Sequence, residues 1–253
     1  MSDRHRRVLT DVEFDVLWGR LGLGPTPVAL RLPSPGRTAI ERRDVQRAGW
    51  QALRDRGLLS ASGPDPETVR LLHLLARPVR RFELRASWSR SVRAVAAGGP
   101  DLGVLAVRQD ATIALGSCGS LASAVLGVLP GAGPGPGQAC TVPSAVLTAA
   151  LSDPGPCLRA ALRARGVPPP DAGLLALMLA TGPGRAQIVA MVVDGNGVAR
   201  RRGGVLAVLD GPAGRYLLTR TRTGDRGAVE WSTVTPVDHH LLRHHTAELL
   251  GAA

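Results

Sequence analysis

Lysine is absent from this 253-residue sequence, and aromatic residues make up only 3% of it. All 31 basic residues are therefore arginines, and they outnumber the 20 acidic residues to give a formal net charge of +11. A P-loop is excluded because that motif requires a lysine. Few aromatic side chains are present on which bases could stack. The arginines are spread over every segment of a sequence rich in Ala, Gly and Pro, which is typical of a GC-rich genome, so the charge alone does not indicate nucleic-acid binding.

Cysteines and long apolar runs are also scarce. Cys118, Cys140 and Cys157 are odd in number and show no Cys-x-x-Cys spacing, which argues against a zinc site or a disulfide framework. No apolar run approaches the roughly 18 residues that a membrane span needs. The segment 1–7 is charged and leads directly into a helix start, unlike a signal peptide. We therefore expect a cytoplasmic protein without a membrane span.

Motifs of catalysis and cofactor binding are missing as well. Gly19, Gly22 and Gly24 follow a predicted helix, whereas a dinucleotide fingerprint follows a strand. The segment 116–119, Gly-Ser-Cys-Gly, lacks the spacing of a nucleophile elbow. No pair of acidic residues stands out as a general acid and base. We expect no enzyme and no cofactor.

Histidines are concentrated near the C-terminus. His240 and His244 are four residues apart in a predicted helix, a spacing that can chelate a metal. The only further ligand nearby is Asp238. A solvated helix face is the simpler interpretation, and we expect no metal site.

Three stretches recur in the same order about one hundred residues later. The pentapeptide Gly-Val-Leu-Ala-Val occurs at 103–107 and 204–208, and two helix-like segments recur, 52–58 as 161–167 and 65–76 as 169–180. This period is too long for a solenoid repeat. We therefore predict two related half-domains, residues 1–130 and 140–253, joined by a Gly/Pro-rich linker at 131–139.

Each predicted half contains helices followed by a strand meander. Capping boxes at Thr10 and Thr38, and Asp65 followed by a proline, begin three helices in the first half. Alternating polar and apolar residues over 79–88 predict a strand with one buried face. Further strands are predicted at 91–96, 103–107, 112–115, 185–193, 198–202, 204–209, 215–220 and 227–233, and further helices at 119–129, 143–151, 157–165, 171–180 and from a cap at Thr235 to about 250. The fold class is α+β, with pseudo-twofold halves around a central antiparallel sheet flanked by helical bundles.

One strand face differs between the halves. Aligning residue 81 with residue 185 places Glu83, Arg85, Ser87 and Ser89 over Gln187, Val189, Met191 and Val193. The face that is polar in the first copy is therefore apolar in the second. Either a helix covers this face, the commoner outcome, or another protein does.

The sequence resembles the EspG family, the ESX (type VII) secretion-associated proteins of actinobacteria. The resemblance begins in the run 9–24 with Pro27 and covers essentially the whole chain. It continues through Glu41-Arg42, Leu53 to Leu58, Arg200 to Gly204, Gly211 to Tyr216 and Val234 to Pro236. It implies a cytosolic chaperone that binds PE–PPE heterodimers before export and keeps them soluble. It further implies that the apolar helical tip of the partner docks on the central sheet, the adjoining loops and the C-terminal bundle.

Three groups of residues are candidates for the partner-binding surface. Val189, Met191 and Val193 could form an apolar patch, and Arg200, Arg201 and Arg202 could supply charged rim contacts. The loop Gly98, Gly99, Pro100 and Asp101 could reach around the partner. Two alternative functions remain open: a basic nucleic-acid-binding regulatory protein, and a small hydrolase whose site is assembled from distant residues.

Overall fold

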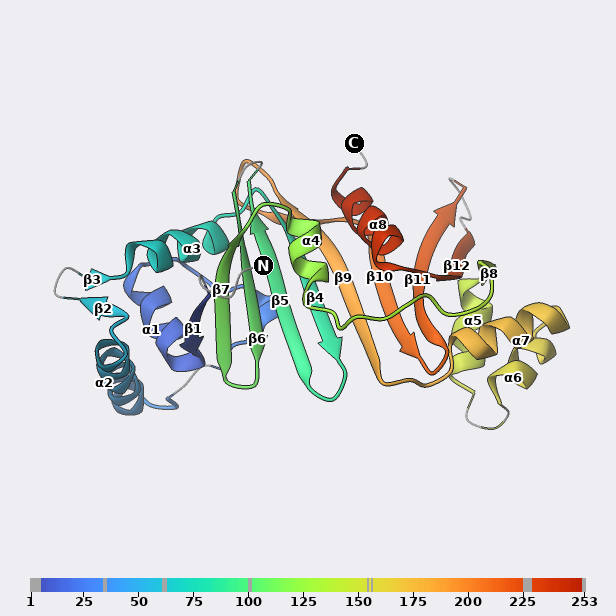
Figure 1. Cartoon of the computed structure of the whole chain (residues 1–253), viewed down its shortest axis with the longest axis horizontal. Coiled ribbons are helices and arrows are strands. Elements are labelled where there is room, and N and C mark those ends of the chain that lie inside the picture. Colours follow the sequence, from blue (N-terminus) through green and yellow to red (C-terminus); the bar gives the residue numbers. More distant parts are fainter. Residues whose placement is uncertain are drawn as a thin grey trace. The chain divides into compact units, whose positions relative to one another are not determined.

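A computed structural model of the chain describes residues 6–33, 36–60, 63–99, 102–153, 155, 157–224 and 229–251 (Figure 1). Its helices are α1 (Asp11–Arg20), the 3-10 helix η2 (Val28–Leu30), α2 (Ala39–Asp55), α3 (Pro66–Ala76), α4 (Leu121–Leu126), α5 (Ser144–Leu151), α6 (Leu158–Ala164), α7 (Pro169–Met178) and α8 (His239–Gly251). Its strands are β1 (Arg7–Thr10), β2 (Leu59–Ser60), β3 (Gly63–Pro64), β4 (Arg80–Ser87), β5 (Ser91–Gly98), β6 (Gly103–Gln109), β7 (Thr112–Cys118), β8 (Cys140–Pro143), β9 (Gly184–Val193), β10 (Ala199–Gly211), β11 (Gly214–Thr223) and β12 (Val229–Pro236). The predicted α+β class is confirmed. No helix in the described ranges is long and apolar enough to cross a membrane.

The predicted helix starts of the first half are present. The Thr10 hydroxyl accepts a hydrogen bond from the Glu13 amide, and the Glu13 carboxylate accepts one from the Thr10 amide, so both partners of the capping box are satisfied. Thr38 and Glu41 form the same reciprocal pair at the start of α2.

Asp65 caps α3 through the amide and the hydroxyl of Thr68, and it forms an ion pair with Arg7. Although burial acts to raise it, these hydrogen bonds and the Arg7 charge bring the pKa of Asp65 below its ordinary value. The cap therefore depends on the ionised carboxylate.

Ten strands form one sheet in the order β1-β7-β6-β5-β4-β9-β10-β11-β12-β8. The paired strands whose register is defined are antiparallel, for example β5 with β6 and β11 with β12. The order is symmetric about β4 and β9: a four-strand meander runs outward from each, and a short strand (β1 or β8) closes each end. This symmetry is the one expected from two related halves.

The chain divides into two compact units that exchange short segments. Unit 1 contains residues 1–85, 90–129 and 190–201, and unit 2 contains residues 86–89, 130–189 and 202–253. Unit 1 thus receives the end of β9 and the start of β10, whereas unit 2 receives the end of β4. The predicted domain limits at 130 and 140 stay a prediction.

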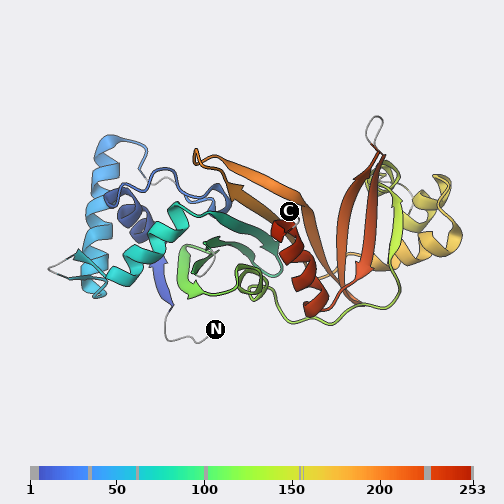
Figure 2. The same cartoon turned by 90° about the horizontal axis from the view of Figure 1, so that it is seen from above.

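The core of unit 1 lies between its sheet and helices α1, α2 and α3. Phe14 and Trp18 stack with ring centroids 5.2 Å apart, and the Trp18 indole donates to the Gly24 carbonyl at 2.7 Å. The fully buried core residues include Leu9, Leu30, Leu53, Leu71, Leu72, Val95, Ala106 and Ile113. Helix α4 lies on the other side of β5 and β6, where Gly103 faces Leu121 (Figure 2). Burial of each large apolar side chain stabilises the unit by about 1.5–3 kcal/mol.

The core of unit 2 lies between helices α5, α6 and α7 and strands β8, β11 and β12. Its fully buried members include Leu147, Leu162, Leu175, Tyr216 and Val234. On β12, the buried Ser232 hydroxyl pairs with the Ser144 hydroxyl at 2.8 Å. The short strands β1 and β8 were not predicted, because four residues are too few to show periodicity.

Two predictions for the second half are wrong. Residues 199–202 and 204–209, predicted as parts of two strands, belong to one strand, β10, in which Gly203 has φ +62°. Only glycine adopts this conformation readily, so the predicted break is a kink within a continuous strand. The last helix does not begin at Thr235, which lies in β12; Asp238 caps it by accepting the Leu241 amide at 2.7 Å.

The repeated helical segments occupy equivalent positions in the two halves, whereas the repeated pentapeptides do not. Segments 65–76 and 169–180 form α3 and α7, each of which precedes the first strand of a meander. The pentapeptide at 103–107 lies in β6, the third strand of its meander, whereas 204–208 lies in β10, the second. The pentapeptides therefore do not mark equivalent strands.

Candidate partner-binding surface

The apolar patch predicted on β9 lies on one face of that strand. Ala186, Ile188 and Ala190 are buried, whereas the intervening Val189 and Met191 are half-buried, as is Val193 at the end of the strand. The Trp88 ring lies where a Cβ on Gly184 would project, so the even-numbered residues of β4 and β9 share one side of the sheet. The odd-numbered residues share the opposite side of the sheet, and the three patch residues on that side are partly accessible to solvent.

Val79 connects the patch to the predicted loop after β5. Its N–H donates to the Gly98 carbonyl at 3.2 Å, and its own carbonyl accepts from the Val193 N–H at 2.9 Å. Gly98 and Val193 therefore flank the same residue. The Val79 side chain is 58% exposed. Val79 precedes β4, and it was not among the predicted site residues because its exposure depends on tertiary structure.

The loop after β5 is only partly described. The Gly99 N–H donates to the Leu102 carbonyl at 3.1 Å, and a Cβ on Gly98 would clash with that same carbonyl. This close approach requires glycine at position 98. Pro100 and Asp101, the other two predicted loop residues, lie outside the described residues.

The turn between β9 and β10 is organised by Asp194. Its carboxylate accepts hydrogen bonds from the amides of Val198 and Asn196, both at 3.0 Å, and from the Arg200 guanidinium at 3.3 Å. The Val198 amide, the Asn196 amide and Arg200 together lower the pKa of Asp194. These bonds close a tight turn between the two strands, and the Val198 side chain beside it is 49% exposed.

The three predicted rim arginines are exposed and consecutive on β10. Arg200 and Arg201 end the segment of β10 that belongs to unit 1, and Arg202 begins the segment that belongs to unit 2. The Gly203 kink follows directly, where a Cβ would lie 3.0 Å from Leu249 of α8. Charged side chains in such positions mainly affect the rate and selectivity of association.

The motif Gly-Pro-Ala-Gly-Arg-Tyr serves the interior of unit 2. Arg215 is 2% exposed, and its Nε and Nη2 donate to Asp210 Oδ1 and Oδ2 at 2.6 and 2.8 Å. Trp88 Nε1 donates to the same Oδ2 at 2.9 Å, and Arg215 Nη2 also donates to the Pro130 carbonyl at 2.8 Å. The sequence singled out this motif but gave no partner for the arginine, because Asp210 and Trp88 are brought to it by the fold.

The Gly/Pro-rich segment after α4 runs along β11. The Gly135 amide donates to the Arg215 carbonyl and the Arg215 amide donates to the Gly133 carbonyl, at 3.2 and 2.8 Å. The Tyr216 hydroxyl donates to the Pro136 carbonyl at 3.2 Å, and a Cβ on Gly135 would clash with that hydroxyl. This segment is thus fixed by close contacts with β11.

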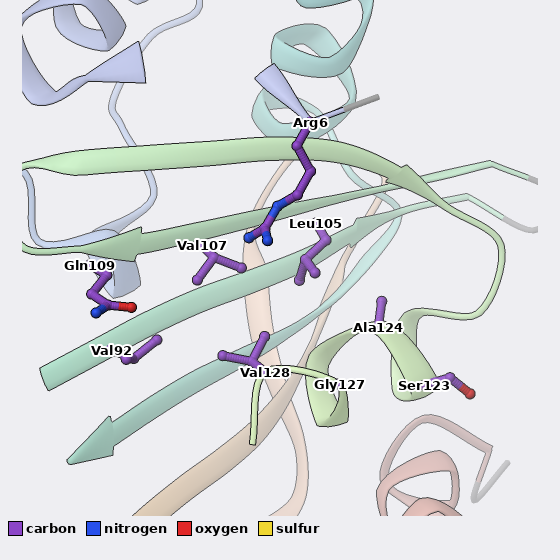
Figure 3. A pocket seen from close by; sticks show the side chains of 9 residues that line it. All are labelled: Arg6, Val92, Leu105, Val107, Gln109, Ser123, Ala124, Gly127 and Val128. Atoms are coloured by element: carbon purple, nitrogen blue, oxygen red, sulfur yellow. The ribbon is translucent and has the colours of Figure 1, made fainter. Parts of the chain in front are cut away.

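A cavity of about 380 Å³ lies in unit 1 beside α4. Figure 3 shows the Arg6 side chain pointing toward Leu105 and Val107, with Val92 and Val128 on the other side. The nine lining residues include no Asp, Glu, His or Cys. This lining offers no carboxylate or imidazole that could act as a general base, and its polar members are Arg6, Gln109 and Ser123.

The histidines and cysteines gather into no site within the described ranges. His244 and His245 both contact Glu248 of α8, at 3.1 and 3.2 Å, and no group of three or more metal-binding side chains is found there. Cys157 is exposed, and burial raises the pKa of the Cys118 thiol to about 11. A thiol with that pKa is a poor nucleophile at neutral pH.

Comparisons with known proteins agree with this architecture. The solved structure of the Mycobacterium tuberculosis type VII secretion system chaperone EspG5 in complex with a PE25–PPE41 dimer matches with a TM-score of 0.75 at 17% sequence identity. The match covers 97% of this chain and 95% of that one, so the two share a fold. A comparison with curated proteins gave no match. The family model described as "EspG family" matches residues 10–248, nearly the whole chain, and the protein therefore belongs to the EspG family.

Proposed function

We propose that this protein is a cytoplasmic chaperone of a type VII secretion system that binds PE–PPE heterodimers and keeps them soluble for export. The observation that carries the proposal is the family match over residues 10–248, combined with a fold shared with a chaperone solved in complex with a PE–PPE dimer. No catalytic step is part of the proposal.

The proposed docking surface combines apolar and charged side chains. Its apolar part would consist of Val189, Met191 and Val193 on β9, which would contact apolar residues of the partner. These side chains are half-buried, and removing their remaining apolar surface from water on binding is favourable. Arg200, Arg201 and Arg202 would form its charged rim. Gly98 and Gly99, with Pro100 and Asp101, would border it beyond Val79.

The first test is co-expression with PE–PPE pairs from the same genome, followed by gel filtration with light scattering. We expect a discrete complex holding one copy of each of the three chains. If no pair from that genome binds the folded chain, the proposed function is wrong.

The second test separates docking from folding. Met191→Asp places a charge in the apolar patch, and we expect cargo affinity to fall at least tenfold, about 1.4 kcal/mol, while far-UV circular dichroism stays unchanged. Ile40→Asp is the matched control, because Ile40 is a 69% exposed apolar residue on α2. Unchanged affinity in a folded Met191→Asp variant would rule out the patch, and loss of folding would assign Met191 to the core.

A further inference from the structure

Four arginines of unit 1 gather on one face of its sheet. Arg93 and Arg108 are direct neighbours in the register of β5 and β6, and Arg85 of β4 and Arg31 after η2 lie close to Arg93. Burial and the charges of Arg85, Arg31 and Arg108 lower the pKa of Arg93. We call Arg31, Arg85, Arg93 and Arg108 the arginine cluster.

The cluster is held in place by the chain that follows α1. Arg93 Nη1 donates to the Ala29 carbonyl at 3.3 Å, and Arg108 Nη1 donates to the Leu30 carbonyl at 3.4 Å. Arg31 comes next with φ 49° and ψ 55°, a left-handed conformation that is uncommon for a residue with a Cβ. The guanidinium groups of Arg93 and Arg108 thus bind the backbone just before Arg31, whose own backbone conformation is strained. Such strain is often found at binding sites.

The positive charge of the cluster is not balanced within the described chain. Arg108 forms a bidentate pair with Asp11 at 2.6 and 2.8 Å. No carboxylate among the described residues pairs with Arg31, Arg85 or Arg93. Four arginines and one aspartate leave a net charge of 4 − 1 = +3. Arg31 and Arg85 are exposed, so this charge reaches the surface.

The cluster lies on the same side of the sheet as part of the apolar patch. Gly103 of β6 faces α4, so Arg108, five residues along the strand, faces away from it, and Arg93 follows by register. Arg85 is an odd-numbered residue of β4, the strand beside β9 in the sheet, and therefore shares its side with Met191 and Val193. Apolar contacts and unbalanced positive charge are thus found on one face of unit 1.

We propose that the arginine cluster binds a carboxylate-rich segment of the cargo protein next to the residues that dock on β9. This proposal rests on the proposed chaperone function. Guanidinium groups bind carboxylates in bidentate geometry, as Arg108 already does with Asp11. A nucleic acid is the less suitable occupant, because aromatic residues make up only 3% of the sequence, the tyrosine and both phenylalanines are buried, and the cluster itself contains no aromatic side chain on which a base could stack.

The test is the double variant Arg31→Gln/Arg85→Gln of the full chain, which leaves the bonds of Arg93 and Arg108 intact. Its matched control is Arg20→Gln/Arg54→Gln, which removes the same charge from exposed positions on α1 and α2. In stopped-flow association with the cargo pair, we expect the double variant to bind about tenfold more slowly at about 50 mM salt. The difference should fall to about twofold or less at about 500 mM, because salt screens steering by exposed charges. The control should stay within about twofold of wild type.

Each outcome decides the proposal. Equal slowing of both variants would assign the effect to net charge and overturn it, as would an unchanged rate in the double variant. Binding of oligo(dT) that is lost in the double variant would overturn the choice of a protein ligand. If no cargo pair binds wild type, the chaperone function itself fails. Fluorescein-labelled hexaglutamate, which should bind wild type more tightly than the double variant, then decides whether the cluster binds carboxylates.

Discussion

Replacing Asp210 by Asn isolates the contribution of the buried ion pair of unit 2. The variant keeps the shape of the side chain, but it removes the negative charge beside Arg215, which is 2% exposed. Three hydrogen bonds end on this carboxylate: two from Arg215, at 2.6 and 2.8 Å, and one from Trp88, at 2.9 Å. The amide group of asparagine has one acceptor atom, and its NH₂ would face other donors.

The expected loss of stability follows from this geometry. Removing one partner of a buried ion pair leaves an uncompensated charge and costs about 3–5 kcal/mol. Asp153→Asn is the control, because it breaks the Arg165–Asp153 pair of the same unit, whose side chains are 30% and 28% exposed. That loss should be about 1 kcal/mol or less.

Hydrogen exchange measured by mass spectrometry on peptides from β10 and β11 would report the stability of unit 2 directly. The apolar double variant Asp210→Leu/Arg215→Met should recover part of the loss, because it removes both charges together. If Asp210→Asn costs no more than Asp153→Asn, the interpretation of Arg215 as a charge that needs its partner is wrong.

Three further predictions concern other parts of the chain. Gly135→Ala should lower the unfolding free energy of unit 2 by about 1–3 kcal/mol in urea titrations, because the new methyl group clashes with the Tyr216 hydroxyl, whereas Gly133→Ala should not, since nothing lies within 4 Å of its Cβ position. Ellman's reagent at pH 8 should label one thiol of the native protein rapidly, that of Cys157, and all three only after denaturation; rapid labelling of a second native thiol would contradict the burial. Because folding lowers the pKa of Asp65, its contribution, under about 1 kcal/mol, is complete above its unfolded pKa and is lost as the pH falls below about 4. The Asp65→Asn variant should therefore approach wild type in stability on acidification, and a constant difference from pH 6 to pH 3 would refute this.

Local signals in the sequence located most elements of the fold. Capping boxes and strand alternation depend on neighbours a few residues apart, and Thr10, Thr38 and the strand at 79–88 were therefore placed correctly. Gly203 was taken as a break because sequence does not distinguish a kinked strand from two strands. Thr235 was taken as a helix cap because the pairing of β12 with β11, which extends the strand through Thr235 to Pro236, is a long-range contact.

The candidate site was less accessible to sequence analysis. The apolar alternation of β9 was visible, but the half-buried state of Met191 depends on neighbouring strands that approach it only in the fold. The arginines are spread evenly along the sequence, but this spacing says nothing about which of them lie close together in the fold. Arg31, Arg85 and Arg93 come together because β4, β5 and the segment after η2 converge, and no local pattern records that convergence.

The exchange of segments between the units constrains how the protein can be made. Unit 1 is complete only once residues 190–201, which lie about four-fifths of the way along the chain, have been synthesised, and unit 2 needs Trp88, which is made early. The edge of β4 that pairs with β9 therefore stays unpaired until β9 has been synthesised. An unpaired strand edge readily recruits other chains, so the period of greatest risk of aggregation for this protein is its own translation.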